Sequence, residues 1–288
     1  MSVPCPIPDH LALEIEDAQA VCVGDLHIGL ESELRSKGVH VPSQTHRMER
    51  ELVRLSVGRE RIILLGDLKN KVPGSSRQEY AEIPRFIKMM QRHYGTVDLV
   101  RGNHDTSIEE FLPEGVNVHP ASGFVLGDVG FVHGHTWPSP EVMSRRYLVM
   151  AHNHPTVALE DSLGNISKEP CWVRFPVLDN AGKRYMEVPE EVIMVPAFNR
   201  SLGGSPVNIT GGKLLGPLFS DGLLDLKAGK VYLTTASILA PSATSWCAAP
   251  PGSGRSPTAT GPITDAFSPD ASGWSSGVRG PTAGGSLR

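Results

Sequence analysis

The chain has 288 residues, of which 40% are hydrophobic, so it is long enough for one large domain or two small ones with a sizeable core. Its formal net charge of −4 argues against a protein that binds nucleic acid by bulk charge, although a local basic face stays open. No apolar run reaches the ~18 residues that span a bilayer, and residues 1–10 lack the pattern of a signal peptide, so we expect a cytoplasmic protein without membrane contact.

Up to Phe111, short apolar runs alternate with helical patterns. Buried strands are predicted at residues 18–23, 61–65 and 97–100, and an edge strand of alternating polarity at 11–15. Helices are predicted at residues 28–37, 45–55 and 78–93, the last two because their apolar positions recur with a period near 3.6. This alternation indicates helices that cover a sheet.

After Phe111 the pattern changes to closely spaced strands. They are predicted at residues 116–119, 123–126, 129–132, 147–151, 157–159, 171–177, 192–197 and 230–234, with a short helix at 139–145. The second half therefore favours a more antiparallel sheet than the first. We predict an α/β chain, close to α+β in character, in which two sheets stack in a single domain.

Residues 241–288 differ in composition from the rest. Ser, Thr, Pro, Gly and Ala dominate there, and no hydrophobic period is present. Such a segment buries too little apolar surface to offset the entropy lost on ordering. We predict a folded domain over residues 1–240 and a disordered, low-complexity tail over residues 241–288, to which we assign no function.

Side chains that bind metals stand directly after five of the predicted buried strands. They are Asp25 and His27, then Asp67, then Asn103 and His104, then His133, and last His152 and His154. Taken singly, an Asp-x-His or a Gly-Asp pair is more often a turn, and a lone histidine is more often a structural or surface residue. Five such elements in one order argue against coincidence. We predict one metal site assembled from five strand ends.

Carboxylates, imidazoles and one amide suit Mn, Fe, Zn or Co, and the four cysteines lack the spacing of a thiolate site. Seven candidate ligands exceed what one ion takes, so we predict two ions about 3.5–4 Å apart that share Asp67. Mn²⁺ is expected first, with Fe, Zn, Co or Mg as alternatives. Such a pair turns a bridging water into hydroxide near neutral pH, for attack on phosphorus. His104 is predicted to serve the leaving group, with Asp105 accepting a hydrogen bond from its ring.

The same blocks resemble the signature motifs of the calcineurin-like metallophosphoesterases. The matching residues are Gly24-Asp25-Leu26-His27, Gly66-Asp67, Gly102-Asn103-His104-Asp105, His133-Gly134 and His152-Asn153-His154, with Ala151 where the family usually has Gly. Residues 66–69, 133–138 and 195–199 are similar to a narrower group, the ICC-like predicted phosphoesterases, which are relatives of the SbcD-type nucleases and of PdeM. Asn70 departs from that narrower pattern, in which His often follows the Lys.

The resemblance implies a four-layer αββα sandwich of two mixed β-sheets flanked by helices. It implies that one metal is held by Asp25, His27, Asp67 and His154, the other by Asp67, Asn103, His133 and His152, and that His104 and Asp105 are catalytic. Lys69 and His135 belong to the narrower pattern. For each of them, contact with phosphate and a supporting or surface role stay open as alternatives.

The expected function is that of a dinuclear metal-dependent phosphoesterase of the phosphodiesterase or nuclease type. Its partner would be a phosphoester substrate, with DNA or a nucleotide as candidates, and the sequence carries no expectation for the oligomeric state. The alternatives are a phosphatase, a small-nucleotide phosphodiesterase, and a non-catalytic metal-binding scaffold. The presence of every ligand and of His104 argues against the scaffold.

Overall fold

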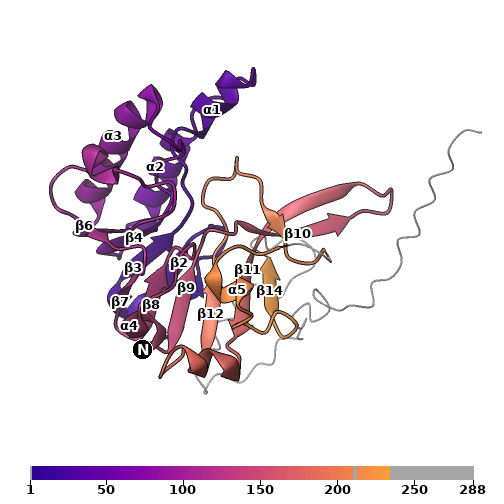
Figure 1. Ribbon diagram of the computed structural model, residues 1–288. Helices are drawn as coiled ribbons and strands as arrows, with labels where there is room; N and C mark the ends of the chain where they lie inside the picture. The colour runs from indigo at the N-terminus through magenta and orange to yellow at the C-terminus, as the bar shows by residue number, and fades with distance from the viewer. Residues whose placement is uncertain (1, 210–212, 234–288) are drawn as a thin grey trace, which may run out of the picture.

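The computed structural model describes residues 2–209 and 213–233 (Figure 1). The predicted tail, residues 241–288, therefore lies outside the described residues. Within them, two β-sheets pack face to face and helices cover their outer faces. The predicted architecture of two stacked mixed sheets with flanking helices is confirmed.

The first sheet is built from the N-terminal part of the chain. Its strands, in spatial order, are β1 (Cys5–Pro6), β2 (Leu13–Ile15), β3 (Ala20–Val23), β4 (Arg61–Leu65), β5 (Thr96–Val100) and β6 (Val116–His119). Strands β3 to β6 are parallel, and β1, β2 and β3 pair antiparallel. The two-residue β1 covers the outer side of β2, so the prediction of an edge strand there was wrong.

The second sheet is built from the later part. Its order is β13 (Ser205–Pro206), β10 (Pro155–Glu160), β11 (Ile166–Pro176), β12 (Glu191–Met194), β9 (Tyr147–Met150), β8 (Val129–Val132) and β7 (Phe124–Leu126), and β14 (Lys230–Leu233) also pairs with β11. Strand β9 pairs parallel with both β8 and β12, and β10 pairs parallel with β13. Strand β11 pairs antiparallel with β10, β12 and β14, and β7 pairs antiparallel with β8.

Alternation along the strands separates the layers. On β4, Ile63 and Leu65 pack between the sheets, whereas Ile62 and Leu64 face the helices, as a period of two requires. The helices over the first sheet are α2 (Thr45–Leu55) and α3 (Arg77–His93). The short helices over the second are α4 (Pro140–Met143), η3 (Asp179–Lys183) and α5 (Pro217–Ser220). The remaining helices are η1 (Glu16–Ala18), α1 (Leu30–Ser36) and η2 (Ile108–Phe111).

The start of α3 is defined by a capping box. The Ser76 side chain accepts a hydrogen bond from the amide of Glu79, and the Glu79 carboxylate accepts one from the amide of Ser76. The same carboxylate accepts from the amides of Asn70 (2.9 Å) and Lys71 (2.6 Å). The helix start therefore also anchors the loop that follows β4.

The parallel strands bring the predicted site together. Because β3, β4 and β5 run parallel, their carboxyl ends lie at one edge of the first sheet. Parallel β8 and β9 deliver two more carboxyl ends from the second sheet, and a bridge between Gly24 and Ala197 joins the two sheets there. Within residues 2–209 and 213–233, none of the helices has the length and apolarity that a membrane crossing requires.

Candidate metal centre

The turns after the strands hold their backbone in an unusual conformation. Five predicted ligands have positive φ angles, namely Asp25 (56°), His27 (43°), Asp67 (51°), His152 (74°) and His154 (44°). A residue other than glycine in this region costs on the order of 1–3 kcal/mol and persists only where its surroundings enforce it. Hydrogen bonds between the turns supply that enforcement, because the amide of Asp25 donates to Gly66 and that of His27 donates to Asp67.

Two glycines make room for the side chains of this site. A Cβ atom on Gly66, whose φ is +80°, would lie 2.3 Å from Nδ1 of His133. A Cβ atom on Gly102 would lie 2.1 Å from Oδ1 of Asp67. Both separations are far below van der Waals contact, so only glycine allows the turns to close around these two residues.

Three overlapping groups of side chains are arranged as metal ligands are. They are Asp25 with His27 and His154, His27 with Asp67 and His104, and Asp67 with His133 and His152, and in each group the ligand atoms lie within 4.8 Å of one another. Asp67 belongs to two groups that otherwise share no residue with each other. The structure thus brings together six of the seven predicted ligands and His104.

Each of three histidines is oriented by an oxygen atom behind it. The Nδ1 atoms of His27, His133 and His154 lie 3.2, 2.9 and 3.2 Å from Oδ1 of Asn70, the carbonyl of Leu65 and the carbonyl of Gly203, respectively. If Nδ1 carries the proton in each ring, Nε2 is left with its lone pair.

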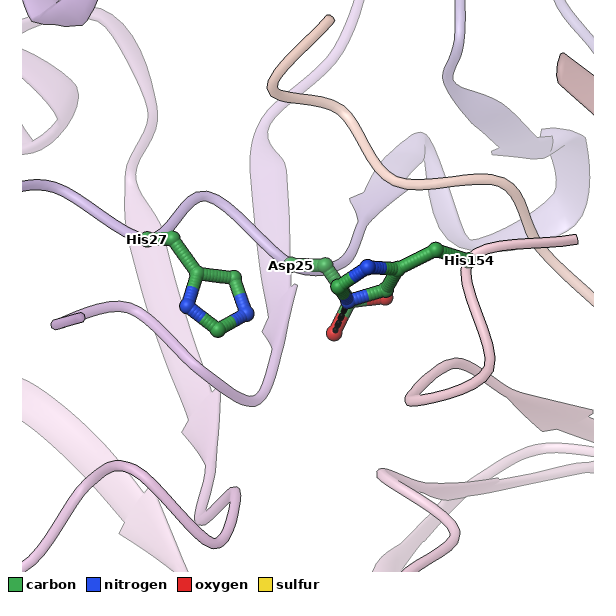
Figure 2. Close-up of side chains that lie close together, drawn as sticks. All are labelled: Asp25, His27 and His154. Carbon is green, nitrogen blue, oxygen red and sulfur yellow. Dashed lines mark ion pairs between the residues drawn. The ribbon is translucent and has the colours of Figure 1, made fainter. Parts of the chain in front are cut away.

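Those Nε2 atoms face the carboxylates. Nε2 of His27 and of His133 lie 3.5 and 3.3 Å from Oδ2 of Asp67, and Nε2 of His154 lies 3.3 Å from Oδ1 of Asp25. Figure 2 shows the His154 ring directed at the Asp25 carboxylate, with His27 beside it. An outer acceptor on Nδ1 and an inward Nε2 is the arrangement of metal-bound histidines.

Three buried atoms at the centre have no hydrogen-bond partner among residues 2–209 and 213–233. They are Oδ1 of Asp25, Nε2 of His27 and Nε2 of His133. Buried polar groups are normally satisfied, and leaving one unpaired costs about 1–3 kcal/mol. Buried atoms that have lone pairs, lack a hydrogen bond and point toward one another can each give an electron pair to a cation. The residues present therefore fit a bound metal ion.

Mutual attraction sets the charge state of the centre in the metal-free protein. Burial disfavours the charged form of each group and so tends to raise the pKa of a carboxyl group. At Asp25 the attraction of His154 and His133 is stronger than this effect and lowers the pKa. At Asp67 the attraction of His133 and His27 lowers the pKa in the same way. Burial likewise opposes charge on His133, yet Asp67 and Asp25 raise its pKa to about 9. At His152, burial and the neighbouring His133 lower the pKa to about 4.

These shifts predict that metal binding releases protons. His133, with a pKa of about 9, is protonated at pH 7 without metal and must lose that proton to bind one. Apparent Mn²⁺ affinity should therefore rise as pH increases toward 9, by about tenfold per unit for one proton. Calorimetric titration with Mn²⁺ at pH 7, in two buffers of different ionisation enthalpy, measures the number released. Binding without net proton release would contradict His133 as a ligand, and His46→Gln, on exposed α2 surface, is the control.

Asp105 does not orient the His104 ring, which corrects the expectation from the sequence. Its buried carboxylate accepts hydrogen bonds from three backbone amides, those of Leu68 (2.9 Å), Lys69 (3.2 Å) and Gly102 (2.9 Å). Nδ1 of His104 instead contacts the carbonyl of Asn70. Asp105 therefore ties together the two turns that carry Asp67 and His104. Its carboxylate is occupied by these amides and does not bond to the ring of His104.

The remaining predicted residues lie around this cluster. Asn103 is exposed in the turn beside His104, and its side chain makes no hydrogen bond to any described residue. The ring of His135 is half-buried, with its centroid 5.3 Å from that of His133 and 6.0 Å from that of His152. Burial and the charge of His133 lower the pKa of His135 to about 4. His135 is thus a neutral neighbour of the centre.

Lys69 is neither a surface residue nor directed at the centre. Its side chain is fully buried, and its ammonium donates to the carbonyls of Lys71 and Gly74 (3.0 Å). Of the roles considered for Lys69, neither contact with phosphate nor a surface position agrees with this burial and these bonds. Lys69 instead holds the loop that presents Asn70. The backbone path of residues 70–74 curls back over the lysine, which only the folded loop reveals.

We predict that Lys69→Met destabilises the protein by about 1–3 kcal/mol, because two loop carbonyls lose their donor. Urea denaturation measures this change. Lys71→Met is the matched control, since the neighbouring Lys71 side chain is exposed and only its backbone takes part in the loop. Unchanged stability together with a raised KM would instead indicate contact with substrate.

Sequence reasoning missed two asparagines at the site. Asn70 accepts a hydrogen bond from Nδ1 of His27 through Oδ1, supports His104 through its carbonyl, and donates from Nδ2 to Glu33 (2.8 Å). Asn199 donates from Nδ2 to the carbonyl of Leu26 (2.9 Å), inside the turn that carries Asp25 and His27. Their positions in the sequence could have indicated a role at the site. Asn70 follows Asp67 by three residues, and Asn199 ends the segment 195–199.

In the comparison with protein families, residues 19–184 match the family described as calcineurin-like phosphoesterase. This range is more than half of the chain and includes every predicted ligand from Asp25 to His154. No curated protein matches the sequence.

Comparison with solved structures gives similar chains at low identity. The nuclease MPE of Pseudomonas putida is 20% identical, with a TM-score of 0.48 and coverage of 83% of this chain and 97% of that one. The phosphoesterase Yfce of E. coli is 19% identical, with a TM-score of 0.31 and coverage of 50% of this chain and 74% of that one.

Proposed function

The chain belongs to the calcineurin-like phosphoesterase family, and from this premise we propose that it hydrolyses phosphodiester bonds with two divalent metal ions. The observation that carries the proposal is the position of Asp67. Its Oδ2 atom lies 3.5 Å from Nε2 of His27 and 3.3 Å from Nε2 of His133, which belong to different ligand groups. One carboxylate between two sets of donors is the arrangement that a shared ligand requires.

The proposed ligands divide into two sets around that carboxylate. One ion is assigned to Asp25, His27, Asp67 and His154, and the other to Asp67, Asn103, His133 and His152. The oxygen and imidazole donors favour Mn²⁺, with Fe, Zn, Co and Mg as alternatives. When bound, such a pair acidifies water and neutralises charge on phosphoryl oxygens.

The protein's own groups serve the leaving oxygen. The ring of His104 lies 4.7 Å from that of His27, and the Asn70 carbonyl contacts Nδ1, which fixes the orientation of the ring. Nε2 is then the donor that gives a proton to the departing alkoxide. Asp105 acts indirectly in this proposal, by holding the turn of His104 against that of Asp67.

A cavity beside His104 accommodates a leaving group. It has a volume of about 460 Å³ and lies between α1 and the loop after β4, and its lining includes Glu33, Asn70, Lys71 and His104. A substrate with a bulky group on the leaving side of phosphorus fits this space. The cavity therefore supports an ester of a large alcohol, as in a nucleic acid or nucleotide.

The test is a substrate panel run in parallel with Mn²⁺, Mg²⁺ and Zn²⁺. We expect bis(p-nitrophenyl) phosphate to be hydrolysed with a higher kcat/KM than p-nitrophenyl phosphate, and single-stranded DNA to be cleaved. Preference for the monoester would instead assign a phosphatase, and cleavage of dinucleotides but not of DNA a small-nucleotide phosphodiesterase. Metal binding without turnover of any substrate would leave only a scaffold.

A further inference from the structure

A second cavity lies on the side of the metal centre that carries His154, and arginines dominate its lining. Its volume is about 440 Å³, and its lining residues are Asp9, His10, Arg47, Arg50, Glu51, Arg54 and Arg200. We call it the arginine cavity. Four guanidinium groups face two carboxylates there, in a chain whose overall charge is −4.

Three of these arginines form a stripe on α2. Arg47, Arg50 and Arg54 are spaced three and four residues apart, so they share one face of the helix. The opposite face, with Met48, Leu52 and Leu55 buried, packs on the first sheet. Like charges at this spacing destabilise a helix, so the stripe is not explained by the stability of α2.

The guanidinium groups are available to bind a ligand. Arg50, Arg54 and Arg200 make no ion pair or side-chain hydrogen bond to any described residue, and Arg47 bonds only to Oε1 of Gln44. Glu51, the α2 carboxylate that lines the same cavity, is instead bonded to Nδ1 of His10 at 2.9 Å.

Several other arginines are paired with carboxylates, whereas others, such as Arg92, make no ion pair to any described residue. Arg59 pairs with Glu14 at 2.8 Å, and Arg61 pairs with Asp98 at 2.8 Å. What distinguishes the four arginines of the arginine cavity is that they converge on one space and that none of them is paired with a carboxylate among the described residues, which indicates a binding site for anions.

Arg200 connects the arginine cavity to the metal centre. It also lines a small cavity whose wall includes His154. The residue before it, Asn199, hydrogen-bonds through its side chain to Leu26 and through its amide to Asp25. Arg200 is therefore held at the rim of the centre, between the proposed ligands and the stripe on α2.

We propose that the arginine cavity binds the phosphate groups of a nucleic acid strand whose scissile phosphodiester lies at the metal centre. This inference rests on the proposed function. Arg200 meets a phosphate adjacent to the scissile one, and the α2 stripe meets those beyond it. Planar guanidinium groups pair with phosphate through two parallel hydrogen bonds and read no base. DNA and RNA strands share this chemistry, so both are tested.

The first test measures binding and its dependence on salt. Fluorescein-labelled phosphorothioate dT12 and U12 resist cleavage, and their anisotropy is followed with Mn²⁺ present across a series of KCl concentrations. For four phosphate contacts, log Kd should vary with log[KCl] with a slope near 2.8, and Arg50→Gln/Arg54→Gln should lower that slope by about 1.4. Arg200→Gln, on a different segment, should lower it by about 0.7. Arg92→Gln, at the exposed end of α3, is the matched control.

The second test compares substrates by length. The ratio of kcat/KM for a dT12 strand to kcat/KM for bis(p-nitrophenyl) phosphate should fall at least tenfold in the double variant, because only the strand reaches the stripe. An unchanged ratio and an unchanged salt slope in folded variants would overturn the inference. If wild type hydrolyses the small diester while neither strand binds, the inference fails and the proposed function stands. Arginine-dependent binding without hydrolysis of any diester would support the cavity and overturn the proposed function.

Discussion

Asp67→Asn is expected to lower metal-stimulated turnover by more than about 100-fold, the upper range seen when only an outer partner of a metal ligand is removed. Asparagine keeps the oxygen that accepts from the amide of His104 at 2.8 Å, so the turn is preserved. It removes the negative charge that both His27 and His133 face. Turnover of bis(p-nitrophenyl) phosphate with Mn²⁺ and metal content by mass spectrometry measure the two consequences.

The metal content sharpens this experiment. If two ions share Asp67, its replacement should reduce the number of ions bound per chain to fewer than two. It should not merely weaken the binding of one ion. Asp98→Asn is the matched control, because Asp98 is also a buried aspartate and it pairs with Arg61 and His119 away from the centre. Full Mn²⁺-stimulated activity in Asp67→Asn would reject the bridging role.

His104→Ala is expected to retain both metals and to lose about 10²–10⁴-fold in turnover, the usual contribution of positioned proton transfer. The loss should be larger for a diester with an alkyl leaving group than for one with p-nitrophenolate, since the poorer leaving group depends more on the proton. Paired kcat measurements on the two substrates test this difference.

Metal analysis of the same variant separates two roles for His104. The ring also lies in a ligand group with His27 and Asp67, so loss of an ion in His104→Ala would show that it binds metal and would contradict the proton-donor role. His119→Ala is the control, as His119 is a half-buried histidine held by Asp98 and stacked on Phe124. Equal losses for both leaving groups would also count against proton transfer.

Local pattern was sufficient to predict most of the fold. Helix α2 spans Thr45–Leu55 as predicted, and α3 begins one residue before its predicted start, because apolar periodicity is a property of the segment itself. The two-residue strands β1 and β13 were not predicted. They have no periodic pattern of their own and form only because distant strands offer free edges.

The sequence by itself predicted the sheet edge at which the candidate metal ligands meet and six of the side chains that lie there. Its five blocks each follow a buried strand, and parallel strands place their carboxyl ends together. Asp25, His27, Asp67, His133, His152 and His154 therefore converge as predicted. That outcome depends on strand order and direction, which short apolar runs and their spacing encode.

Only the tertiary structure decided which side chains and backbone groups hold each candidate ligand in place. Asn70 lies 43 residues from His27 in sequence, yet their side chains meet, and Asp105 binds the amides of residues 68 and 69 in place of the ring of His104. Arg200 likewise reaches the α2 stripe only across the fold. Polar side chains choose among partners by distance and direction within about 3 Å, and those distances between remote segments exist only once the two sheets have packed.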